Sequence, residues 1–462
     1  MRAAEVARGI LLAECARPDG PRGEIGKCPA DDEAELAMRE ILLSAFPGWG
    51  FLGEETGVHD AAPGESCMWV VDPNDGTTTM QRGYRGHAIS IGVVRDGLPI
   101  LGVVWAVDAP DDRGDLFTWA EDCAPLTRNG IVVATPRWRS RLSPDDIVGV
   151  SQSANRNPVG YAHCVAPARF IGVPSIAYRL ALVAAGDHVA TLSLNPLRAW
   201  DYAGGHALIR AAGGVVLDAL GNSVAYPAHG LGTPTRVFAG SPSVVGSLIH
   251  QQWEGVTRSG FGESEPPPDV YPIRPIPGRL VHDSGVLSRA QGSFLGQLLG
   301  DWAGGQPGPA GEEAILLARS LVMGTSQPAP SLASAAPLGI CAAEQTGEVG
   351  LLAATLTRVI RDGLDAQTTV GFARDLAAAR GVTIGDTLTR ALSALVHDTT
   401  FGDPVSGALF GAVYGRDFFP RPLQQRVLSS RARGRPAHYW PTDLFAMIER
   451  LLTTEPGSGS LS

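Results

Sequence analysis

The sequence has few cysteines, and no two of them are close together. Six cysteines occur among 462 residues, without any Cys-x-x-Cys pair. This scatter predicts neither a zinc site nor a disulfide framework. Free thiols are typical of a reducing compartment, so we expect a cytoplasmic protein. The six are Cys15, Cys28, Cys67, Cys123, Cys164 and Cys341.

Long apolar runs and an excess of basic residues are also missing. No stretch reaches the roughly 18 uninterrupted apolar residues that a membrane helix needs. Glu5 and Glu14 interrupt the first apolar stretch, so it is unlike a signal peptide. The formal net charge of −10 argues against a nucleic-acid or anionic-membrane partner.

The length predicts two or three domains, because 462 residues are too many for one ordinary domain. Hydrophobic residues make up 44% of the chain and charged residues 18%, as in globular proteins. Mixed helix and strand patterns over 1–255 predict an α/β domain. Prolines over 256–285 predict a linker, helical spacing over 286–455 predicts an all-α domain, and 456–462 resembles a disordered tail.

The first domain shows both helical and strand periodicity. Apolar residues spaced by three and four predict helices over 1–17, 31–46 and 175–185, and another opening at Trp200. Alternating residues predict strands over 88–94 and 99–107, joined by a hairpin turn at 95–97. Shorter apolar runs predict strands at 51–53, 147–151, 188–194 and 215–217.

Residues 68–79 carry the clearest chemical signal in the chain. An apolar, strand-like run of four residues ends at a turn signal formed by Asp72 and the following proline. Proline fixes the loop in one bent shape, in which Asp72, Asp75 and the Asn74 carbonyl can converge. Oxygen ligands of this kind suit Mg²⁺. An Asx/Pro turn between two strands explains the same residues, so this segment alone leaves both readings open.

The residues that follow are suited to an anion. Gly76 lets the backbone approach a ligand closely, and Thr77 and Thr78 offer hydroxyl groups where a helix could begin. The free N–H groups of a helix start favour negative charge, and phosphate is the obvious candidate.

Two further acidic clusters lie on either side of this motif in the sequence. One is Gly53-Glu54-Glu55 and the other is Trp200-Asp201-Tyr202-Ala203-Gly204-Gly205. Together the three clusters resemble the inositol monophosphatase superfamily, whose signatures are G-E-E, D-P-x-D-G-T-x and W-D-x-A-G-G in this order. Residues 175–186 are similar to the family helix before the last strand. The resemblance covers about residues 1–250 and implies a layered αβαβα sandwich.

The resemblance implies a set of metal ligands. Glu54, Asp72 and the Asn74 carbonyl would bind one Mg²⁺, and Asp72 would share a second with Asp75 and Asp201. Carboxylates crowded in this way would repel one another strongly without cations. Metal ions a few Å apart can acidify a bound water and neutralise the charge of a reacting phosphate.

The resemblance also implies catalytic and substrate-binding roles. Thr77, together with Glu54, would orient and deprotonate the attacking water, and Asp31 would support the threonine and a weaker third metal. The residues expected to hold the phosphate are Gly76, Thr77, Thr78 and Arg198.

The sequence departs from the family where inositol-specific members bind the sugar. The position seven before Asp201, an acid in those members, is Leu194 here, and Arg198 lies nearby. Thr79 and Met80 stand where the family often has Asn and Phe. Myo-inositol phosphate is therefore not secured as the substrate, and a sugar or nucleotide phosphate fits as well.

The second domain has glycines four apart over 292–300 and again over 407–415, which predicts close contact between helices. These segments resemble the ADP-ribosylglycohydrolase family, an all-α fold that binds Mg²⁺ through acidic pairs, over about residues 286–452. The motif acids are degenerate here, with only Asp301 and Asp398 in place. Two separated acids rarely hold a catalytic metal pair. We therefore expect a binding or packing domain without hydrolase activity. The alternative is an ordinary helical bundle that only superficially resembles this family.

The sequence as a whole predicts a Mg²⁺-dependent phosphomonoesterase acting on a small sugar, inositol or nucleotide phosphate, with a small-molecule partner and no nucleic acid or membrane. A homodimer is expected by resemblance only. Two alternatives stay open. One is a bifunctional enzyme acting on phosphorylated ADP-ribose or related nucleotides, and the other is a binding or scaffold protein with two inactive domains.

Overall fold

The computed structural model describes residues 1–226, 236–257, 273–278, 281–303, 305–325, 330–397, 401–431 and 435–454. Much of the predicted linker, the predicted tail and Asp398 lie outside these residues. Contacts between Cα atoms divide the chain into two compact units. Unit 1 comprises Met1–Ser264 and Pro277–Arg279, and unit 2 comprises Glu265–Ile276 and Leu280–Ser462. Every helix that the structure describes is too short or too polar to span a lipid bilayer.

Unit 1 is built on two β-sheets. The larger has the strand order β2-β1-β3-β4-β5-β6-β7-β8, and the smaller has the order β10-β9-β11-β13-β12. The strands of the larger sheet are β1 Gly50–Gly53, β2 Gly57–His59, β3 Cys67–Asp75, β4 Ala88–Arg95, β5 Leu98–Ala106, β6 Asp115–Ala120, β7 Ala124–Arg128 and β8 Ile131–Val132. Those of the smaller sheet are β9 Ile147–Val150, β10 Arg169–Gly172, β11 Ala190–Ser193, β12 Val215–Asp218 and β13 Val237–Gly240.

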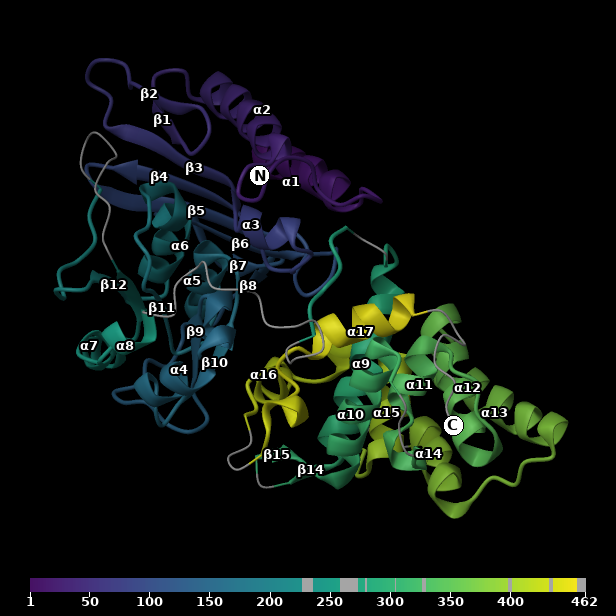
Figure 1. Ribbon diagram of the computed structural model, residues 1–462. Coiled ribbons are helices and arrows are strands. Elements are labelled where there is room, and N and C mark those ends of the chain that lie inside the picture. The colour runs from purple at the N-terminus through teal and green to yellow at the C-terminus, as the bar shows by residue number, and fades with distance from the viewer. Residues whose placement is uncertain are drawn as a thin grey trace. The chain divides into compact units, whose positions relative to one another are not determined.

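Helices cover these sheets in layers (Figure 1). The helices of unit 1 are α1 Arg2–Cys15, α2 Pro29–Ala45, α3 Thr77–Gln81, α4 Pro158–Cys164, α5 Ile176–Ala184, α6 Ala199–Ala211, α7 Pro242–Ile249 and α8 Glu254–Thr257. The pair α1 and α2 packs on one face of the larger sheet, and α5 and α6 pack on the other. The smaller sheet meets α5 on one side and α4 and α7 on the other. The predicted αβαβα sandwich is confirmed.

The first half of strand β3, Cys67 to Val71, is apolar because both faces of the sheet are covered there. Val71 packs with α1 and α2, whereas Val70 packs with α5 and α6, as the two-residue period of a strand requires. The predicted hairpin is also confirmed. Strands β4 and β5 pair in antiparallel fashion, and the turn residues Asp96 and Gly97 have φ angles of 51° and 79°. Two positive φ angles are typical of a tight hairpin turn.

The expected turn at Asp72 is wrong, because β3 continues through the motif to Asp75. Asp72 pairs with Ser90 and Asp75 with Ala88, so β3 advances three residues while β4 advances two. This extra residue is a β-bulge, a place where a strand tolerates proline. In a regular strand, residues three apart point to opposite faces. The bulge changes that parity and brings Asp72 and Asp75 to the same face of the sheet.

Glycines let α6 lie unusually close to the larger sheet. A Cβ atom added at Gly102 would overlap the Gly204 carbonyl oxygen, and one added at Gly92 would lie 2.9 Å from the Ala203 Cβ atom. On the other side of α6, a Cβ atom at Gly205 would lie 2.6 Å from the Leu180 Cβ atom of α5. The two glycines at the end of the third acidic cluster are therefore packing residues, and they fix the position of α6.

Where its residues are described, unit 2 is helical apart from one pair of two-residue strands, β14 Trp302–Ala303 and β15 Gln306–Pro307. That pair is a small departure from the expected all-α domain. Its helices enclose one large apolar core. They are α9 Ser284–Gly300, α10 Pro309–Met323, α11 Ala336–Cys341, α12 Gly347–Asp362, α13 Ala366–Arg380, α14 Asp386–His397, α15 Pro404–Tyr414, α16 Arg421–Leu428 and α17 Leu444–Thr453.

The close helix contact predicted from the glycines of unit 2 is confirmed. A Cβ atom added at Gly296 on α9 would overlap the Gly407 carbonyl oxygen on α15, and the reverse substitution would overlap the Gly296 carbonyl oxygen. Gly292 and Gly411 make the same reciprocal approach one helical turn away. The two backbones therefore touch along a seam that admits no side chain.

We expect Gly296→Ala to destabilise unit 2 by about 1–3 kcal/mol, because the new methyl group forces α9 and α15 apart. Gly371→Ala is the matched control, since Gly371 lies within α13 and an added Cβ atom meets nothing within 4 Å. It should be neutral or stabilise by about 0.5–1 kcal/mol through higher helix propensity. Thermal and urea unfolding of the whole chain measure both effects. Equal stability of the two variants would contradict the close-packed seam.

Candidate active site

Four carboxylates from three distant segments meet in unit 1. Glu54 lies in the turn between β1 and β2, and Asp201 lies in the first turn of α6. Asp72 and Asp75 lie on either side of the bulge in β3. The charges of Glu54, Asp75 and Asp201 all act on Asp72. The structure thus brings together the four acids that the sequence suggested as metal ligands.

Asp72 is the most enclosed of the four. Only 1% of its surface is exposed, and the Asn74 amide N–H donates a hydrogen bond of 2.7 Å to its Oδ1 atom. Burial raises the pKa of Asp72 well above its usual value, and the neighbouring acids raise it further. An ionised Asp72 therefore costs free energy unless a cation lies beside it.

Glu54 joins the cluster from the turn between β1 and β2. The buried side chain of Glu35 holds this turn in place. Burial among protein atoms raises the pKa of Glu54 to about 7, and a hydrogen bond with Asp72 partly opposes this rise. Part of the Glu54 surface is nevertheless exposed to solvent. Glu35, on α2, accepts hydrogen bonds from the amides of Glu55 at 3.0 Å and Thr56 at 2.6 Å. A Cβ atom at Gly53 would overlap Glu35, so this position requires glycine.

Asp75 is held at the start of α5. Its Oδ2 atom accepts hydrogen bonds from the Ser175 hydroxyl at 2.6 Å and from the Ala177 amide at 2.8 Å. Ser175 also caps this helix by accepting from the Tyr178 amide. Burial raises the pKa of Asp75, while these hydrogen bonds and the charge of the buried Arg179 lower it in part.

Asp201 has two roles at the start of α6. Its Oδ2 atom accepts a hydrogen bond of 2.6 Å from the Arg198 amide, so Asp201 is the third residue of the helix and closes a capping box on the N-cap residue Arg198. Burial, followed by the charge of Asp75, raises the pKa of Asp201 well above its usual value. The exposed Arg198 lies close enough to lower that pKa in part. The capping bond therefore leaves Asp201 within the acidic cluster.

A second polar network lies on the opposite face of β3. The Thr77 hydroxyl is 2.7 Å from Asp31 Oδ2 and 3.1 Å from the Asn74 carbonyl oxygen. The Asn74 side-chain amide donates to Asp31 Oδ1 at 2.8 Å. Asp31 is 2% exposed, and burial raises its pKa to about 6. The predicted support of Thr77 by Asp31 thus has a direct geometric basis.

The expected anion-binding residues lie at the start of α3. Gly76 has a φ angle of 113°, which favours glycine, and the helix begins at Thr77 as the sequence suggested. The Thr79 and Met80 amides donate to the Gly76 carbonyl oxygen, which places the amides of Thr77 and Thr78 in the unpaired first turn. Thr77 and Thr78 are both half-buried.

Several residues of the site were missed by sequence reasoning. Glu35 and Ser175 hold Glu54 and Asp75 in place, and His87 contacts the Asn74 side chain. Glu35 lies four residues after Asp31 on one helix, and this spacing was an available signal. Neither Ser175 nor His87 belongs to a pattern that points to the cluster.

The donor set fits a hard divalent cation, because all the converging side-chain ligands are oxygen atoms. No three of these carboxylates, within the described residues, offer oxygens that all lie within 4.8 Å of one another.

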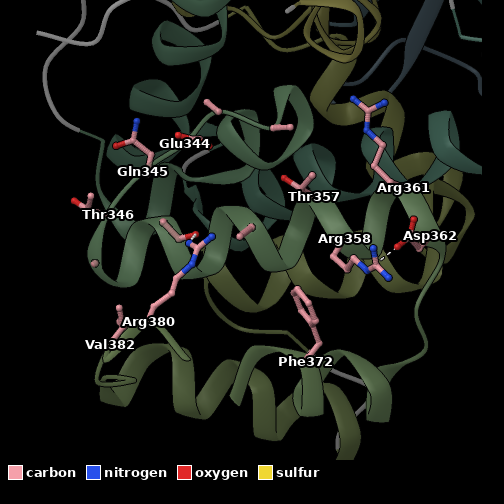
Figure 2. A pocket seen from close by; sticks show the side chains of 15 residues that line it. Glu344, Gln345, Thr346, Thr357, Arg358, Arg361, Asp362, Phe372, Arg380 and Val382 are labelled. Carbon is pink, nitrogen blue, oxygen red and sulfur yellow. Dashed lines mark hydrogen bonds and ion pairs between the residues drawn. The ribbon is translucent and has the colours of Figure 1, made fainter. Parts of the chain in front are cut away.

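Unit 2 presents a different kind of surface. A pocket of about 860 Å³ opens between α12 and α13 and carries three arginines, Arg358, Arg361 and Arg380, beside Phe372 (Figure 2). Arg358 forms an ion pair of 2.6 Å with Asp362. The motif acid Asp301 accepts a hydrogen bond of 2.8 Å from the Gly311 amide at the start of α10.

Comparison with known proteins gives a consistent result for unit 1. Residues 28–256 match the family described as the inositol monophosphatase family. An inositol-1-monophosphatase from Caulobacter vibrioides is 32% identical over 199 residues, which cover 40% of this chain and 73% of that protein. A Nus factor SuhB from Xylella fastidiosa is 28% identical over 249 residues, covering 51% of this chain and 83% of that protein. The solved structure of the extragenic suppressor protein suhB from Bartonella henselae has 25% identity and a TM-score of 0.45, covering 54% of this chain and 94% of that one.

The fold, the site and these relatives define a metal-dependent phosphatase. The chain belongs to the inositol monophosphatase family through residues 28–256. It is therefore an enzyme that hydrolyses phosphoric monoesters, as the sequence predicted. The resemblance of residues 286–452 to ADP-ribosylglycohydrolases stays a prediction.

The acidic cluster predicts a pH-dependent response to Mg²⁺. Carboxylate pKa values raised in the folded state mean that the folded protein binds more protons than the unfolded chain between about pH 4 and 7. The cluster therefore lowers the stability of the metal-free protein as the pH rises through this range. Mg²⁺ at a hundred times its Kd at pH 8 should stabilise the protein by about 2.7 kcal/mol at pH 8, and the same concentration should stabilise it less at pH 5.

Thermal unfolding with EDTA or with Mg²⁺ at both pH values measures this response. Asp72→Asn is the diagnostic variant, because it removes one buried charge at constant size. It should raise the Tm of the metal-free protein at pH 8 and reduce the shift caused by Mg²⁺. An equal Mg²⁺ shift at the two pH values would contradict the expected linkage.

Proposed function

We propose that unit 1 is a Mg²⁺-dependent phosphomonoesterase for a small sugar, inositol or nucleotide phosphate. The observation that carries this proposal is the convergence of Glu54, Asp72, Asp75 and Asp201. The fold buries Asp72, half-buries Asp75 and Asp201, leaves Glu54 exposed, and raises the pKa values of all four, which is unfavourable for stability. A functional cation explains why acids from three distant segments are placed together at that cost.

The proposed ligands divide between two cations. Glu54, Asp72 and the Asn74 carbonyl would hold one, and Asp72, Asp75 and Asp201 would hold the other. Bound Mg²⁺ supplies positive charge that stabilises the phosphoryl oxygens and acidifies water. The hydrogen bonds to Asp75 from Ser175 and Ala177 both go to its Oδ2 atom, so Oδ1 would be the ligand atom.

The residues around Thr77 would position the attacking water. When Thr77 donates its proton to Asp31, the oxygen lone pairs of Thr77 can accept a hydrogen bond from water. Glu54 would take the remaining proton, and its pKa of about 7 in the metal-free protein suits a general base near neutral pH. The two carboxylates thus have different roles, one orienting the threonine and the other accepting the proton.

The phosphate and the rest of the substrate would occupy the open side of the cluster. The unpaired amides of Thr77 and Thr78 follow the left-handed Gly76, which lets a phosphate approach the backbone. The exposed Arg198 lies beside Asp201 and would contact a second polar or anionic group of the substrate. Relatives named inositol-1-monophosphatase support an inositol phosphate, whereas Leu194 in place of an acid supports a broader choice.

For unit 2 we propose a binding role without glycohydrolase activity. One remaining motif acid, Asp301, accepts a hydrogen bond from the Gly311 amide, and the other, Asp398, lies outside the described residues. The arginines of the pocket in Figure 2 suit an anionic ligand. Release of ADP-ribose from a model substrate by the full chain would contradict this proposal and support a bifunctional enzyme.

A phosphatase panel tests the proposed activity of unit 1. We expect phosphate release from some of the sugar, inositol and nucleotide phosphates in the presence of Mg²⁺ and none with EDTA. Asp72→Asn should lower kcat/KM by about a thousandfold, or about 4 kcal/mol, because it removes a ligand shared by both cations. Asp60→Asn, at an exposed position, is the matched control and should retain activity. Activity in Asp72→Asn equal to wild type would refute the assignment.

Substitutions at Thr77 test the proposed orientation of water. Thr77→Val keeps the shape of the side chain but removes the hydroxyl group, so kcat should fall by about 10²–10³-fold. KM should change little, since the threonine is proposed to act on water. Thr77→Ser restores the hydroxyl group and should recover most of kcat. A loss in the serine variant as large as in the valine variant would indicate a packing role instead.

A further inference from the structure

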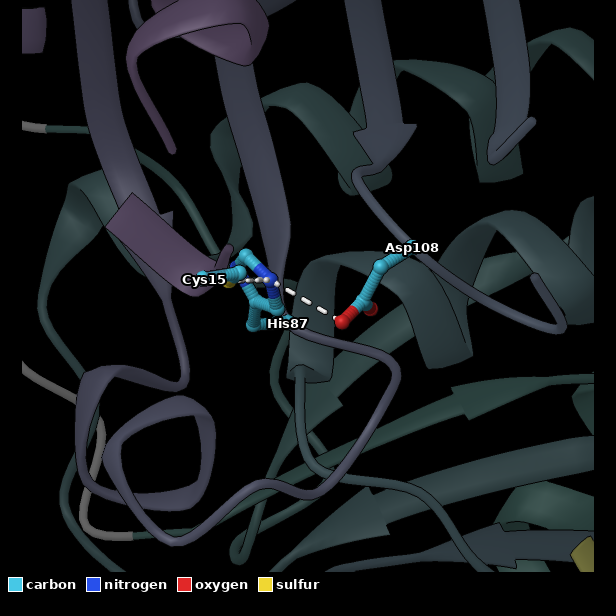
Figure 3. A group of neighbouring side chains, drawn as sticks. All are labelled: Cys15, His87 and Asp108. Atoms are coloured by element: carbon cyan, nitrogen blue, oxygen red, sulfur yellow. Dashed lines mark hydrogen bonds and ion pairs between the residues drawn. The ribbon is translucent and has the colours of Figure 1, made fainter. Parts of the chain in front are cut away.

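Three residues with metal-binding side chains meet beside the active site, away from the acidic cluster. Cys15 is the last residue of α1, His87 directly precedes β4, and Asp108 follows β5 by two residues. Their side chains point toward one another (Figure 3). All three are buried, with exposed fractions of 1%, 0% and 0%.

The distances between the ligand atoms are those of neighbours around one small ion. His87 Nε2 lies 3.7 Å from Cys15 Sγ and 3.4 Å from Asp108 Oδ2. All three ligand atoms lie within 4.8 Å of one another. For a tetrahedral Zn²⁺ with bonds of about 2.3 Å to sulfur and 2.0–2.1 Å to nitrogen and oxygen, adjacent ligands are about 3.3–3.6 Å apart. The separations of 3.7 Å and 3.4 Å from His87 Nε2 are close to this range, and Cys15 Sγ lies within 4.8 Å of the Asp108 carboxylate.

The hydrogen bonds of Asn74 determine which nitrogen of His87 faces the group. The Asn74 side-chain NH₂ donates to Asp31 Oδ1, so its oxygen is the atom that faces His87 Nδ1, at 2.6 Å. A carbonyl oxygen only accepts, and His87 Nδ1 must therefore carry the proton. In the neutral ring, the Nε2 lone pair then points between Cys15 and Asp108. Metal-binding histidines commonly have this arrangement, with the other ring nitrogen donating to a fixed oxygen.

A neutral, metal-free His87 would bring the Nε2 lone pair close to the Asp108 carboxylate. The Asp108 Oδ1 atom accepts a hydrogen bond of 2.9 Å from the Gly86 amide, and a cation beside Oδ2 would reduce the repulsion between Oδ2 and the Nε2 lone pair at 3.4 Å. A proton would give an imidazolium that pairs with Asp108. A divalent cation would in addition pair with the Cys15 thiolate, so that two negative ligands balance the two positive charges of the ion.

We propose that Cys15, His87 and Asp108 supply three ligands of a site for a Zn²⁺-class cation. The soft thiolate and the imidazole select Zn²⁺ over Mg²⁺, whereas the acidic cluster has only oxygen ligands. The site joins α1 to both strands of the β4–β5 hairpin. It also fixes His87, which orients Asn74 and, through Asp31, Thr77. The three residues are positioning residues for the active site, not catalytic ones.

Metal analysis of the full chain tests this proposal independently of phosphatase activity. We expect protein purified from zinc-supplemented cells and dialysed against excess Mg²⁺ to retain one Zn²⁺ per chain. Replacement by Co²⁺ should give the near-ultraviolet thiolate-to-metal absorption and the intense visible bands of tetrahedral coordination. Because the wild-type protein gives this readout, it does not depend on the folding of a variant.

Single substitutions show which side chains bind the proposed Zn²⁺. Cys15→Ser and His87→Gln should lose the bound metal and the thiolate band, with folding checked by circular dichroism. Cys28→Ser is the control, because Cys28 is also a buried cysteine of unit 1, and it should keep both. Asp72→Asn should keep both as well, which separates this site from the acidic cluster.

Three results would overturn the proposal. They are wild-type protein that retains no Zn²⁺ after exposure to it, a Co²⁺ spectrum without thiolate absorption, and a Cys15→Ser variant that keeps the metal. The first would show that these three residues do not hold a Zn²⁺-class ion. None of these results bears on the Mg²⁺-dependent phosphatase activity, which the substrate panel measures separately.

Discussion

The mutual repulsion of buried carboxylates is the constraint on which unit 1 depends. Asp72 is 1% exposed, and the charges of Glu54, Asp75 and Asp201 all act on it. Each ionised acid makes its neighbours harder to ionise, so the folded protein is stable with this group charged only when cations are present. The surrounding elements can be understood as the scaffold that holds these acids in place against their repulsion.

Two backbone features create that scaffold. The bulge in β3 inserts one residue between Asp72 and Asp75, and so brings both to the face covered by α5 and α6. The glycines of α6 and of the adjoining strands let this helix approach the sheet closely enough for Asp201 to join them. Hydrogen bonds from Ser175 to Asp75 and from the Arg198 amide to Asp201 then fix the individual carboxylates.

Much of the fold followed from local patterns, because apolar periodicity and turn residues act over a few residues. The helices α1, α2, α5 and α6 and the β4–β5 hairpin were all anticipated. The strands β6, β7, β8, β10 and β13 were not, since short strands with mixed composition carry weak signals. The turn expected at Asp72 was wrong, because pairing with β4 extends the strand through a motif whose residues are typical of turns.

The sequence by itself determined the kinds of ligand and their order along the chain, because residue type sets ligand chemistry and the three acidic clusters lie in family order. Only the tertiary structure decided which side chains share a face and which support them. Glu35 and His87 carry no local signal of their roles, and Cys15, His87 and Asp108 are separated by 72 and 21 positions in sequence. Such contacts arise when distant strands and helices pack together, and sequence spacing records only the contacts made within one element.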